Sequence, residues 1–279
     1  RLGVKRRPCH RDPKVIPSAA VRGVVRSGLD SGNRSIVIRR SPSIPWTMSR
    51  KRWTHDTRRM RQGGTERGDG TVYDWWSRHP RALDLLYELA FLGRESTFRQ
   101  RAIETLDPGT GETVLEMGCG NGNSFPALRA GVASSGSVLG FDVSGGMTGA
   151  ARKRIREAGW ENVHVVRGDA RRLPVADRAA DAAYASMSLS AVSDPHGAVE
   201  SIRDALRPGG RFVVLDAQPF RGWPWRLLNP CLVPIARRTT EWVPEVDLPD
   251  TLRQVFAEVS ISTFNGGSIF VAVARKRPG

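Results

Sequence analysis

Cysteine is scarce in this sequence, and long apolar runs are missing from it. The 279 residues include three cysteines, Cys9, Cys119 and Cys231, which form an odd and widely spaced set. Such a set provides neither a disulfide framework nor zinc-ligand spacing, so we expect a reducing compartment and no metal site. No run approaches the roughly 18 uncharged apolar residues of a membrane-spanning helix, and no charged start followed by an apolar core indicates a secretory signal. These absences predict a cytoplasmic protein with a soluble body.

Acidic residues are scarce in the first part of the chain. Residues 1–65 contain 17 Lys and Arg against 3 Asp and Glu, whereas residues 66–279 contain 26 basic and 25 acidic residues. The first segment also lacks a sustained period of 2 or 3.6, so we predict a disordered basic tail. Four interpretations stay open: a nucleic-acid-binding arm, a transit peptide, a membrane-surface contact, or sequence outside the native reading frame. Met48 and Met60, just before globular patterning begins, suggest the last.

Residues 113–124 contain a short apolar strand that runs directly into a glycine-rich turn. Gly118, Gly120 and Gly122 allow a tight turn, and because nothing projects from them a flat nucleoside-type ligand can lie against the main chain. Glu116 places a carboxylate two residues before the first glycine. The pattern predicts a cofactor site, although any tight strand-to-helix turn can be rich in glycine.

Strands and helices alternate after the turn. A strand over 137–142 ends in Asp142, which follows Gly122 by 20 residues, the interval at which a nucleotide-binding βαβ unit places an acid on the ribose hydroxyls. The next strand, 163–166, is followed by Asp169 at the rim where open α/β sheets bind ligands. Further strands are expected over 180–185 and 211–216, and helices over 82–92, 96–106, 124–133, 147–158 and 195–206.

Residues 217–249 interrupt this alternation with three tryptophans and a series of prolines. The stretch is too long and too apolar for an ordinary connection. We interpret it as an inserted cap that shapes an acceptor site; the alternative is a packing insert without ligand contact. Two strands around Asn265-Gly266-Gly267 then predict a closing hairpin. The apolar wall of the cap would consist of Leu227, Leu228, Leu232, Val233 and Ile235.

From about Tyr73 to its end, the chain resembles the class I S-adenosylmethionine (SAM)-dependent methyltransferases. The matching pieces are residues 114–122, Asp142, residues 168–170, residues 206–210 and the terminal hairpin. The resemblance implies an α/β fold over 66–279: a Rossmann-like, doubly wound, seven-stranded sheet, mostly parallel with an antiparallel C-terminal hairpin strand.

Within the family, the layout is most similar to the ubiquinone/menaquinone-biosynthesis methyltransferases and the bacterial phosphatidylethanolamine N-methyltransferases. This likeness implies methyl transfer to a small lipophilic acceptor, either quinone-like or a lipid head group, and it leaves room for a peripheral membrane contact. The quinone enzymes usually have Asp before the glycines, where this chain has Glu116.

The resemblance also implies roles for individual residues. Asp142 would hold the ribose hydroxyls of SAM, and Asp169 would accept a hydrogen bond from the adenine amino group while Ala170 packs beside the ring. Met187 or Ser188 would lie near the sulfonium. The methionine and ribose parts would contact the remaining residues of the predicted site: Glu116 near the amino end, and Gly118, Gly120 and Gly122.

Methyl transfer is a displacement at the sulfonium methyl, so positioning the acceptor and excluding water supply most of the acceleration. A general base is needed only where the acceptor must lose a proton. Tyr73 and His79 are candidates by their location, and a helix-start role is the alternative for His79.

Other functions fit less of the sequence. A nicotinamide dehydrogenase would usually show G-x-G-x-x-G, whereas Gly122 is followed by Asn123. A nucleic-acid or protein methyltransferase using the basic tail is an alternative, but residues 186–189 lack the Asn-Pro-Pro-aromatic sequence that grips a flipped adenine. A non-catalytic SAM-binding protein is the other alternative, and the oligomeric state is not predicted.

Overall fold

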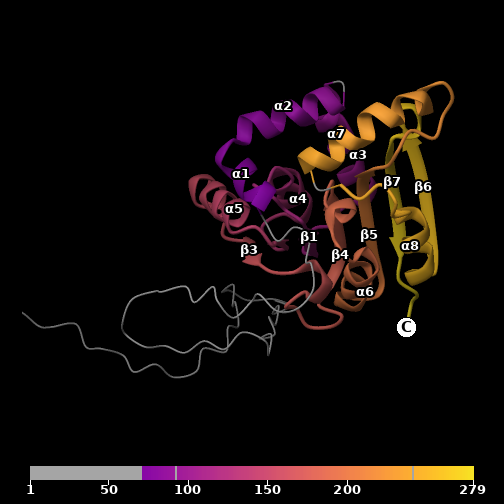
Figure 1. The fold of residues 1–279 in the computed structure, drawn as a ribbon. Coiled ribbons are helices and arrows are strands. Elements are labelled where there is room, and N and C mark those ends of the chain that lie inside the picture. Colours follow the sequence, from indigo (N-terminus) through magenta and orange to yellow (C-terminus); the bar gives the residue numbers. More distant parts are fainter. Residues whose placement is uncertain (1–70, 92, 241) are drawn as a thin grey trace, which may run out of the picture.

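The computed structural model describes residues 71–91, 93–240 and 242–279 (Figure 1). Predictions about the basic tail therefore lie outside the described residues. No helix in the described part of the chain is long and apolar enough to cross a membrane.

Seven strands form one sheet in the order β3-β2-β1-β4-β5-β7-β6. Neighbouring strands from β3 to β5 pair in parallel, and β7 pairs antiparallel with both β5 and β6. This arrangement confirms the predicted fold class. The strands are β1 Thr113–Met117, β2 Ser137–Asp142, β3 Val163–Arg167, β4 Ala180–Ser186, β5 Leu206–Ala217, β6 Glu258–Phe264 and β7 Ile269–Arg275.

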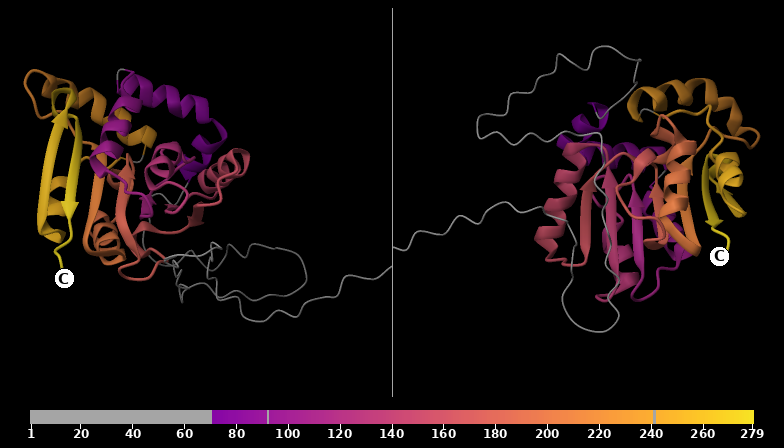
Figure 2. Two further views of the ribbon diagram at one scale, coloured as in Figure 1. Left: turned by 180° about the vertical axis from the view of Figure 1, so that it is seen from behind. Right: turned by 90° about the horizontal axis from the view of Figure 1, so that it is seen from below.

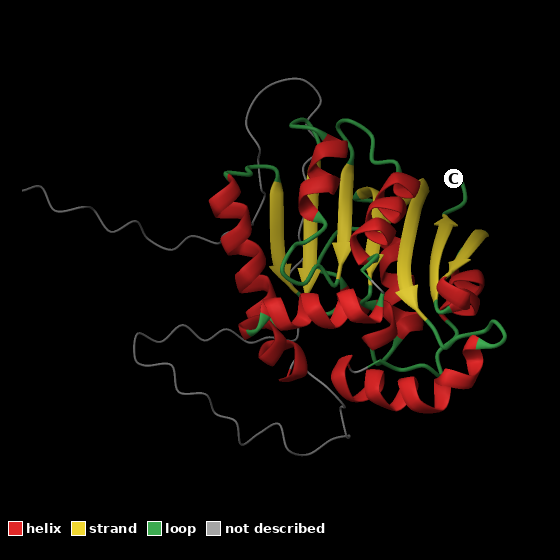
Figure 3. Cartoon of the chain, turned by 90° about the horizontal axis from the view of Figure 1, so that it is seen from above, coloured by secondary structure: helices red, strands yellow, loops and turns green. Residues whose placement is uncertain are grey.

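Helices cover both faces of the sheet (Figure 3). The α-helices are α1 Thr71–Arg78, α2 Pro80–Ala90, α3 Glu95–Leu106, α4 Phe125–Val132, α5 Gly145–Ala158, α6 Pro195–Ala205, α7 Asn229–Thr240 and α8 Leu248–Val255. Short 3₁₀ helices are η1 Ala170–Arg172, η2 Leu189–Ala191, η3 Trp225–Leu228 and η4 Asn265–Gly267.

The side-chain alternation of β1 divides the core into two layers. Leu115 and Met117 belong to a buried cluster that includes residues of α6 and α8. Val114 belongs to a second cluster, with residues of α3, α4 and α5. Because β1 and β4 are covered on both faces, every residue of each strand is buried, as expected for the centre of a parallel sheet.

The parallel strands end at one edge of the sheet, and this edge carries the elements that matter for a ligand. Figures 1 and 2 show α1, α2 and α7 at that end of the molecule. The turns after β1, β2, β3 and β4 open toward the same edge, which is where ligands bind in open α/β sheets.

Two local predictions differ from the structure. Residues 206–210, expected to end a helix, already belong to β5, and the pairing with β4 shifts register between Ala180 and Ala182. The proline-rich insert contains a full helix, α7, which was not predicted. Pro230 occupies its first turn, where a missing N–H is tolerated, and only Pro234 lies inside it.

Candidate functional site

The three glycines after β1 serve two different purposes. Gly118, Gly120 and Gly122 all have positive φ, at 63°, 53° and 79°, a conformation that glycine adopts without steric cost. A Cβ at Gly118 would lie 2.3 Å from the Cβ of Ser188, and one at Gly122 would lie 2.5 Å from the ring of Phe125. A Cβ at Gly120 would meet nothing within 4 Å. Packing therefore requires two of the glycines, whereas Gly120 presents bare backbone to open space.

That open space is a pocket at the carboxyl edge of the sheet. The residues that line the pocket come from the helices before β1, from the glycine turn, and from the segments that follow β2, β3 and β4. The lining consists of Leu83, Tyr87, Arg99, Met117, Gly118, Cys119, Gly120, Asn121, Asn123, Phe141, Asp142, Val143, Met147, Gly168, Asp169, Ala170, Arg171, Ser186, Met187, Ser188, Ala191, Val192 and Ser193.

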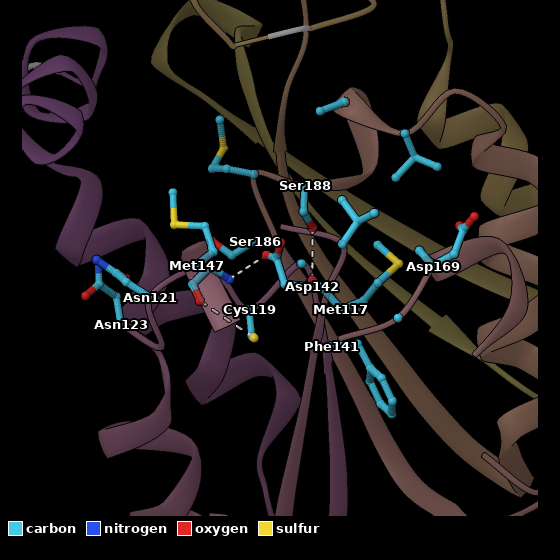
Figure 4. Close-up of a pocket in the computed structure, with 18 of the residues that line it drawn as sticks. Met117, Cys119, Asn121, Asn123, Phe141, Asp142, Met147, Asp169, Ser186 and Ser188 are labelled. Atoms are coloured by element: carbon cyan, nitrogen blue, oxygen red, sulfur yellow. Dashed lines mark hydrogen bonds between the residues drawn. The ribbon is translucent and has the colours of Figure 1, made fainter. Parts of the chain in front are cut away.

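Asp142 lies at the centre of this group, with Asn121 and Asn123 to one side of it and Asp169 to the other (Figure 4). Its Oδ2 accepts a hydrogen bond from the backbone N–H of Gly120 at 2.8 Å, and its Oδ1 accepts one from the N–H of Ser144 at 2.9 Å. The two amides fix the carboxylate against the glycine turn. The predicted ribose acid and the predicted cofactor turn are thus parts of one structure.

Asp169 follows β3, as predicted, and is held by its neighbour. Its Oδ1 accepts from the Arg171 N–H at 2.9 Å, and its Oδ2 forms an ion pair of 2.6 Å with the Arg171 guanidinium. Desolvation acts to raise the pKa of this carboxyl, but the Arg171 contacts outweigh it and hold the pKa below its ordinary value. Asp169 is therefore a charged acceptor at the pocket, beside Ala170.

The segment after β4 also lines the pocket. The N–H of Met187 donates to Leu215 O at 2.8 Å, although Met187 has φ 52°, a left-handed conformation that costs a side-chain-bearing residue about 1–2 kcal/mol. The Ser188 hydroxyl donates to Met117 O at 3.0 Å. These bonds tie the end of β4 to β1 and β5, and they place both predicted residues in the lining.

Glu116 does not line the pocket. Its side chain is buried in β1, and Oε2 has no hydrogen-bond partner. Desolvation raises the pKa of this carboxyl to about 7, against the opposing effects of a hydrogen bond from Ser124 and the charge of Arg99. The prediction placed Glu116 near the amino end of the cofactor; in the structure it is a buried acid beneath the turn.

Two lining residues were missed by the sequence interpretation. Arg99, on α3, donates from Nη1 to the Ser124 hydroxyl at 2.8 Å and forms an ion pair with Glu95. Tyr87, on α2, also lines the pocket. Burial raises the pKa of Tyr87 to about 12, so its hydroxyl keeps its proton at neutral pH. Both belong to helices before the first strand, where no motif distinguished them from packing residues.

The candidate bases and the apolar cap lie elsewhere. His79 is exposed outside the lining, where its ring stacks on Trp75 with centroids 4.3 Å apart and its Nδ1 lies 3.0 Å from Trp75 O. Tyr73 lies on α1, and its side chain is outside the described residues. None of the described residues of 217–249 lines the pocket.

The pocket fits a cofactor made of a nucleoside and an amino acid, such as SAM. The uncovered backbone of Gly120 leaves room for a flat group, and Asp142 and Asp169 supply acceptors on successive strand ends. Phe141, Ala170 and Val192 add apolar surface of the kind that packs against an adenine ring. Each part of such a cofactor therefore has matching chemistry in the lining.

Comparison with known proteins agrees with this fit. Residues 114–210 match the model of a family described as a methyltransferase domain. The chain is 34% identical over 159 residues to the aklanonic acid methyltransferase DauC of Streptomyces sp. (strain C5), covering 56% of this chain and 71% of the relative. It is 32% identical over 171 residues to the demethylmenaquinone methyltransferase of Thermobifida fusca (strain YX), covering 61% of this chain and 66% of the relative.

The extent of the matches varies. One further relative, an uncharacterised 37.1 kDa protein in a transposon of Streptomyces fradiae, is 34% identical over 145 residues, and the match spans 52% of this chain but only 41% of that protein. Among solved structures, a SAM-dependent methyltransferase from Thermotoga maritima shares the fold with a TM-score of 0.56 at 19% identity, covering 74% of this chain and 98% of that one. With SAM as its cofactor, the chain belongs to the class I SAM-dependent methyltransferases.

Proposed function

We propose that this protein transfers the methyl group of SAM to a small lipophilic acceptor of the quinone type. The bare Gly120 backbone beside the Asp142 carboxylate supports the donor half of the proposal. The acceptor half is supported by the relatives, which are named for aklanonic acid and demethylmenaquinone. A lipid head group is the alternative acceptor.

Within this proposal, each of the predicted site residues acts on a different part of the cofactor, although Gly122 and Glu116 are not among the lining residues. Gly118, Gly120 and Gly122 shape the turn along its methionine and ribose parts, and Asp142 accepts from the ribose hydroxyls. Glu116 would act on the amino end through charge, without a contact. The adenine end belongs to Asp169 and Ala170, and Met187 adjoins the sulfonium.

Arg99 extends the proposal to the amino-acid end of the cofactor. Its guanidinium lines the pocket while its other contacts, to Ser124 and Glu95, hold it in place. A fixed guanidinium is the side chain best suited to a carboxylate. We assign Arg99 to the carboxylate of the methionine part.

The bound cofactor supplies an electrophilic methyl group, and the chain's contribution is to position and shield the acceptor. No histidine occurs in the described lining, which suits an acceptor acidic enough to ionise in solution, such as a phenol or hydroquinone. Because Tyr87 stays protonated, its hydroxyl can donate a hydrogen bond to an acceptor oxygen and orient the ring. Leu83, on the same helix, adds an apolar contact.

The donor half is tested by calorimetry with Asp142→Asn. The loss of a charged acceptor should weaken SAM binding more than tenfold, equivalent to about 1.4 kcal/mol or more. Asp194→Asn, which changes an acid that caps α6 and is not among the lining residues, is the matched control and should bind SAM as wild type does. Unchanged binding by Asp142→Asn would remove the ribose assignment.

The acceptor half is tested by incubating the enzyme and labelled SAM with separate quinone and phospholipid fractions. Mass spectrometry should find the added methyl on a quinone-type ring. Labelling confined to phospholipid head groups would favour the alternative, and labelling of nucleic acid or protein instead would refute a small-molecule acceptor.

We also propose that the protein contacts membranes peripherally.

A separate proposal concerns the domain bounds: residues 66–279 form one methyltransferase domain, in which 217–249 is an insert. Deleting residues 1–59 should then leave the melting temperature and SAM affinity unaltered. A large loss of either would show that the basic segment belongs to the domain.

A further inference from the structure

The insert between β5 and α8 exposes most of the large apolar side chains that the described structure leaves in solvent. Nine large hydrophobic residues are exposed in the described chain, and six of them lie between residues 223 and 235. Trp223 is 70% exposed, Leu227 61% and Ile235 59%. We call this set the cap surface: Trp223, Trp225, Leu227, Leu228, Leu232 and Ile235.

The cap surface is mostly in solvent, although one side of the Trp225 ring packs against Gly266 of the hairpin turn. Neither η3 nor α7 contains a buried residue. Leu228, Leu232 and Ile235 are spaced i, i+4 and i+7, which places them along one face. Contact with the body is made elsewhere on α7, where the Trp76 indole N–H donates to Thr239 O at 2.9 Å. The helix is thus anchored to α1 while its apolar face stays uncovered.

The location of the cap surface relates it to the pocket. Figures 1 and 2 show α7 beside α1 and α2 at the carboxyl end of the strands. Leu83 and Tyr87, which line the pocket, belong to α2. On its outer side the same helix exposes Leu85, by 59%. A flat apolar partner that covers the cap surface would therefore lie near the end of the molecule where the pocket forms.

The charge of the segment selects the kind of partner. Residues 217–240 include four arginines and no Asp or Glu, and residues 241–249 contain three acids, Glu241, Glu245 and Asp247. Arg221 pairs with Asp247 at 2.9 Å, and Arg237 pairs with Glu245. In the described part of the chain no carboxylate pairs with Arg226 or Arg238, both of which are exposed. The Arg226 guanidinium lies 5.7 Å from the Trp223 ring centroid, so a cation without a described carboxylate partner lies beside the most exposed of the described tryptophans.

This combination matches the boundary of an anionic lipid bilayer. Tryptophan is favoured at the level of the head groups, where its ring is apolar and its N–H polar. Leucine and isoleucine gain from entering the acyl region, and each arginine near an anionic surface adds about 1 kcal/mol of attraction. A second copy of this chain fits less well. A twofold contact of the cap surface would bring the arginines of both copies together, while Asp247 and Glu245 already pair with Arg221 and Arg237.

We propose that the cap surface docks the protein on anionic membranes, with Trp223 and Trp225 at the head groups and Leu232 and Ile235 in the outer acyl region. The docking rests on the surface alone and does not depend on the identity of the acceptor. It gives the insert a role that requires no contact with the pocket.

Co-sedimentation of the full chain with phosphatidylglycerol-containing vesicles and with pure phosphatidylcholine vesicles tests this docking. We expect binding to the anionic vesicles, and we expect Leu232→Glu/Ile235→Glu to weaken it at least about tenfold, because two apolar anchors become repelled charges. Arg156→Glu, an exposed charge change on α5, is the matched control and should change binding less than about twofold. Calorimetry should find that each variant still binds SAM and is therefore folded. A variant that binds SAM but not vesicles then tests the docking alone, independently of the proposed enzyme function.

The basic segment 1–65 could bind anionic vesicles by itself, and it contains Trp46 and Trp53. The second readout is therefore the part of the tryptophan quenching that depends on Trp223 and Trp225. Vesicles with brominated acyl chains should quench the tryptophan fluorescence of the wild-type protein. Trp223→Phe/Trp225→Phe should lose most of this quenching and still sediment, since phenylalanine keeps the apolar contact.

Three results would overturn the proposal. The first is sedimentation of Leu232→Glu/Ile235→Glu equal to that of wild type. The second is vesicle binding without quenching. The third is a dimer in sedimentation velocity that the same double variant dissociates, which would assign the cap surface to a second copy.

Discussion

The buried Glu116 carboxyl makes a sharp prediction about stability and pH. Glu116 lies in the central strand of the sheet with a side-chain oxygen that no hydrogen bond satisfies. Desolvation raises its pKa from 4.5 to about 7. Glu116→Gln keeps the shape and removes the charge, so it should relieve a penalty that exists only when the carboxyl is ionised.

The size and sign of the effect follow from the shift. The raised pKa means that the folded protein binds this proton more tightly than the unfolded chain does. The stability linked to it is fully present below pH 4.5, is lost as the pH rises to about 7, and stays lost above that. At about 1.4 kcal/mol per pKa unit, the full loss is about 3 kcal/mol. Between pH 5 and pH 8, Glu116→Gln should therefore gain about 2 to 3 kcal/mol relative to wild type.

Urea unfolding of both proteins at several pH values between 5 and 8 measures this gain, because other titrating groups cancel in the difference. Glu157→Gln, at an exposed position of α5, is the control for removing a carboxyl from the surface. A difference between Glu116→Gln and wild type that stays constant with pH would refute the reasoning. A gain that appears only at low pH would reverse its sign and do the same.

Three further substitutions test the packing of the site and the sheet. Gly118→Ala should lower the free energy of unfolding by about 3 kcal/mol, because the new Cβ has both an unfavourable left-handed φ and a 2.3 Å contact with the Cβ of Ser188. Gly120→Ala should lower the free energy of unfolding only through the cost of its φ, about 1 kcal/mol. Its methyl group enters the pocket, so calorimetry should show that, for each kcal/mol of stability lost, Gly120→Ala loses more SAM affinity than Gly118→Ala does. Equal melting temperatures for the two variants would contradict this distinction. Glu112→Gln should cost about 2 kcal/mol at pH 7, since Arg211 donates to this carboxylate at 3.0 and 2.7 Å. Desolvation acts to raise the pKa of Glu112, but the hydrogen bonds from Arg211 and Gly109 outweigh it and hold the pKa below its ordinary 4.5. The stability lost in Glu112→Gln should therefore be present above pH 4.5 and vanish as the pH falls through the lowered pKa. Chemical unfolding at pH 3 and pH 7 measures this loss, and an equal loss at both pH values would count against the ion pair.

The sheet was predictable because the sequence encodes it locally. Buried parallel strands require continuous apolar runs. β2 has the predicted bounds, and β1 begins at Thr113, where the predicted strand-and-turn segment begins. The spacing between Gly122 and Asp142 reflects the length of one helix and one strand, so it locates the acid without any knowledge of long-range contacts. The end of α6 was less predictable, because β5 begins through its pairing with β4, a long-range contact.

Arg99 and Tyr87 could not be assigned to the pocket from the sequence. Their helices precede the first strand, and the apolar period of a helix shows which face is buried without showing what that face meets. Arg99 reaches the turn through Ser124, 25 positions further along the chain, and no local pattern specifies that contact. Tertiary packing alone places these two side chains beside the cofactor turn.

The cap illustrates a different limit, that apolar composition does not say in which direction a side chain points. The wall predicted from residues 227–235 assumed that apolar side chains turn inward, whereas Leu227 and Ile235 are more than half exposed. Charge provides the missing information. Core-facing helices of this protein, such as α6, have acidic and basic residues on their solvent side, because that side is in water. The arginines and the lack of acids in residues 217–240 are the reason for which we prefer the proposed contact with an anionic bilayer to a lid over the pocket.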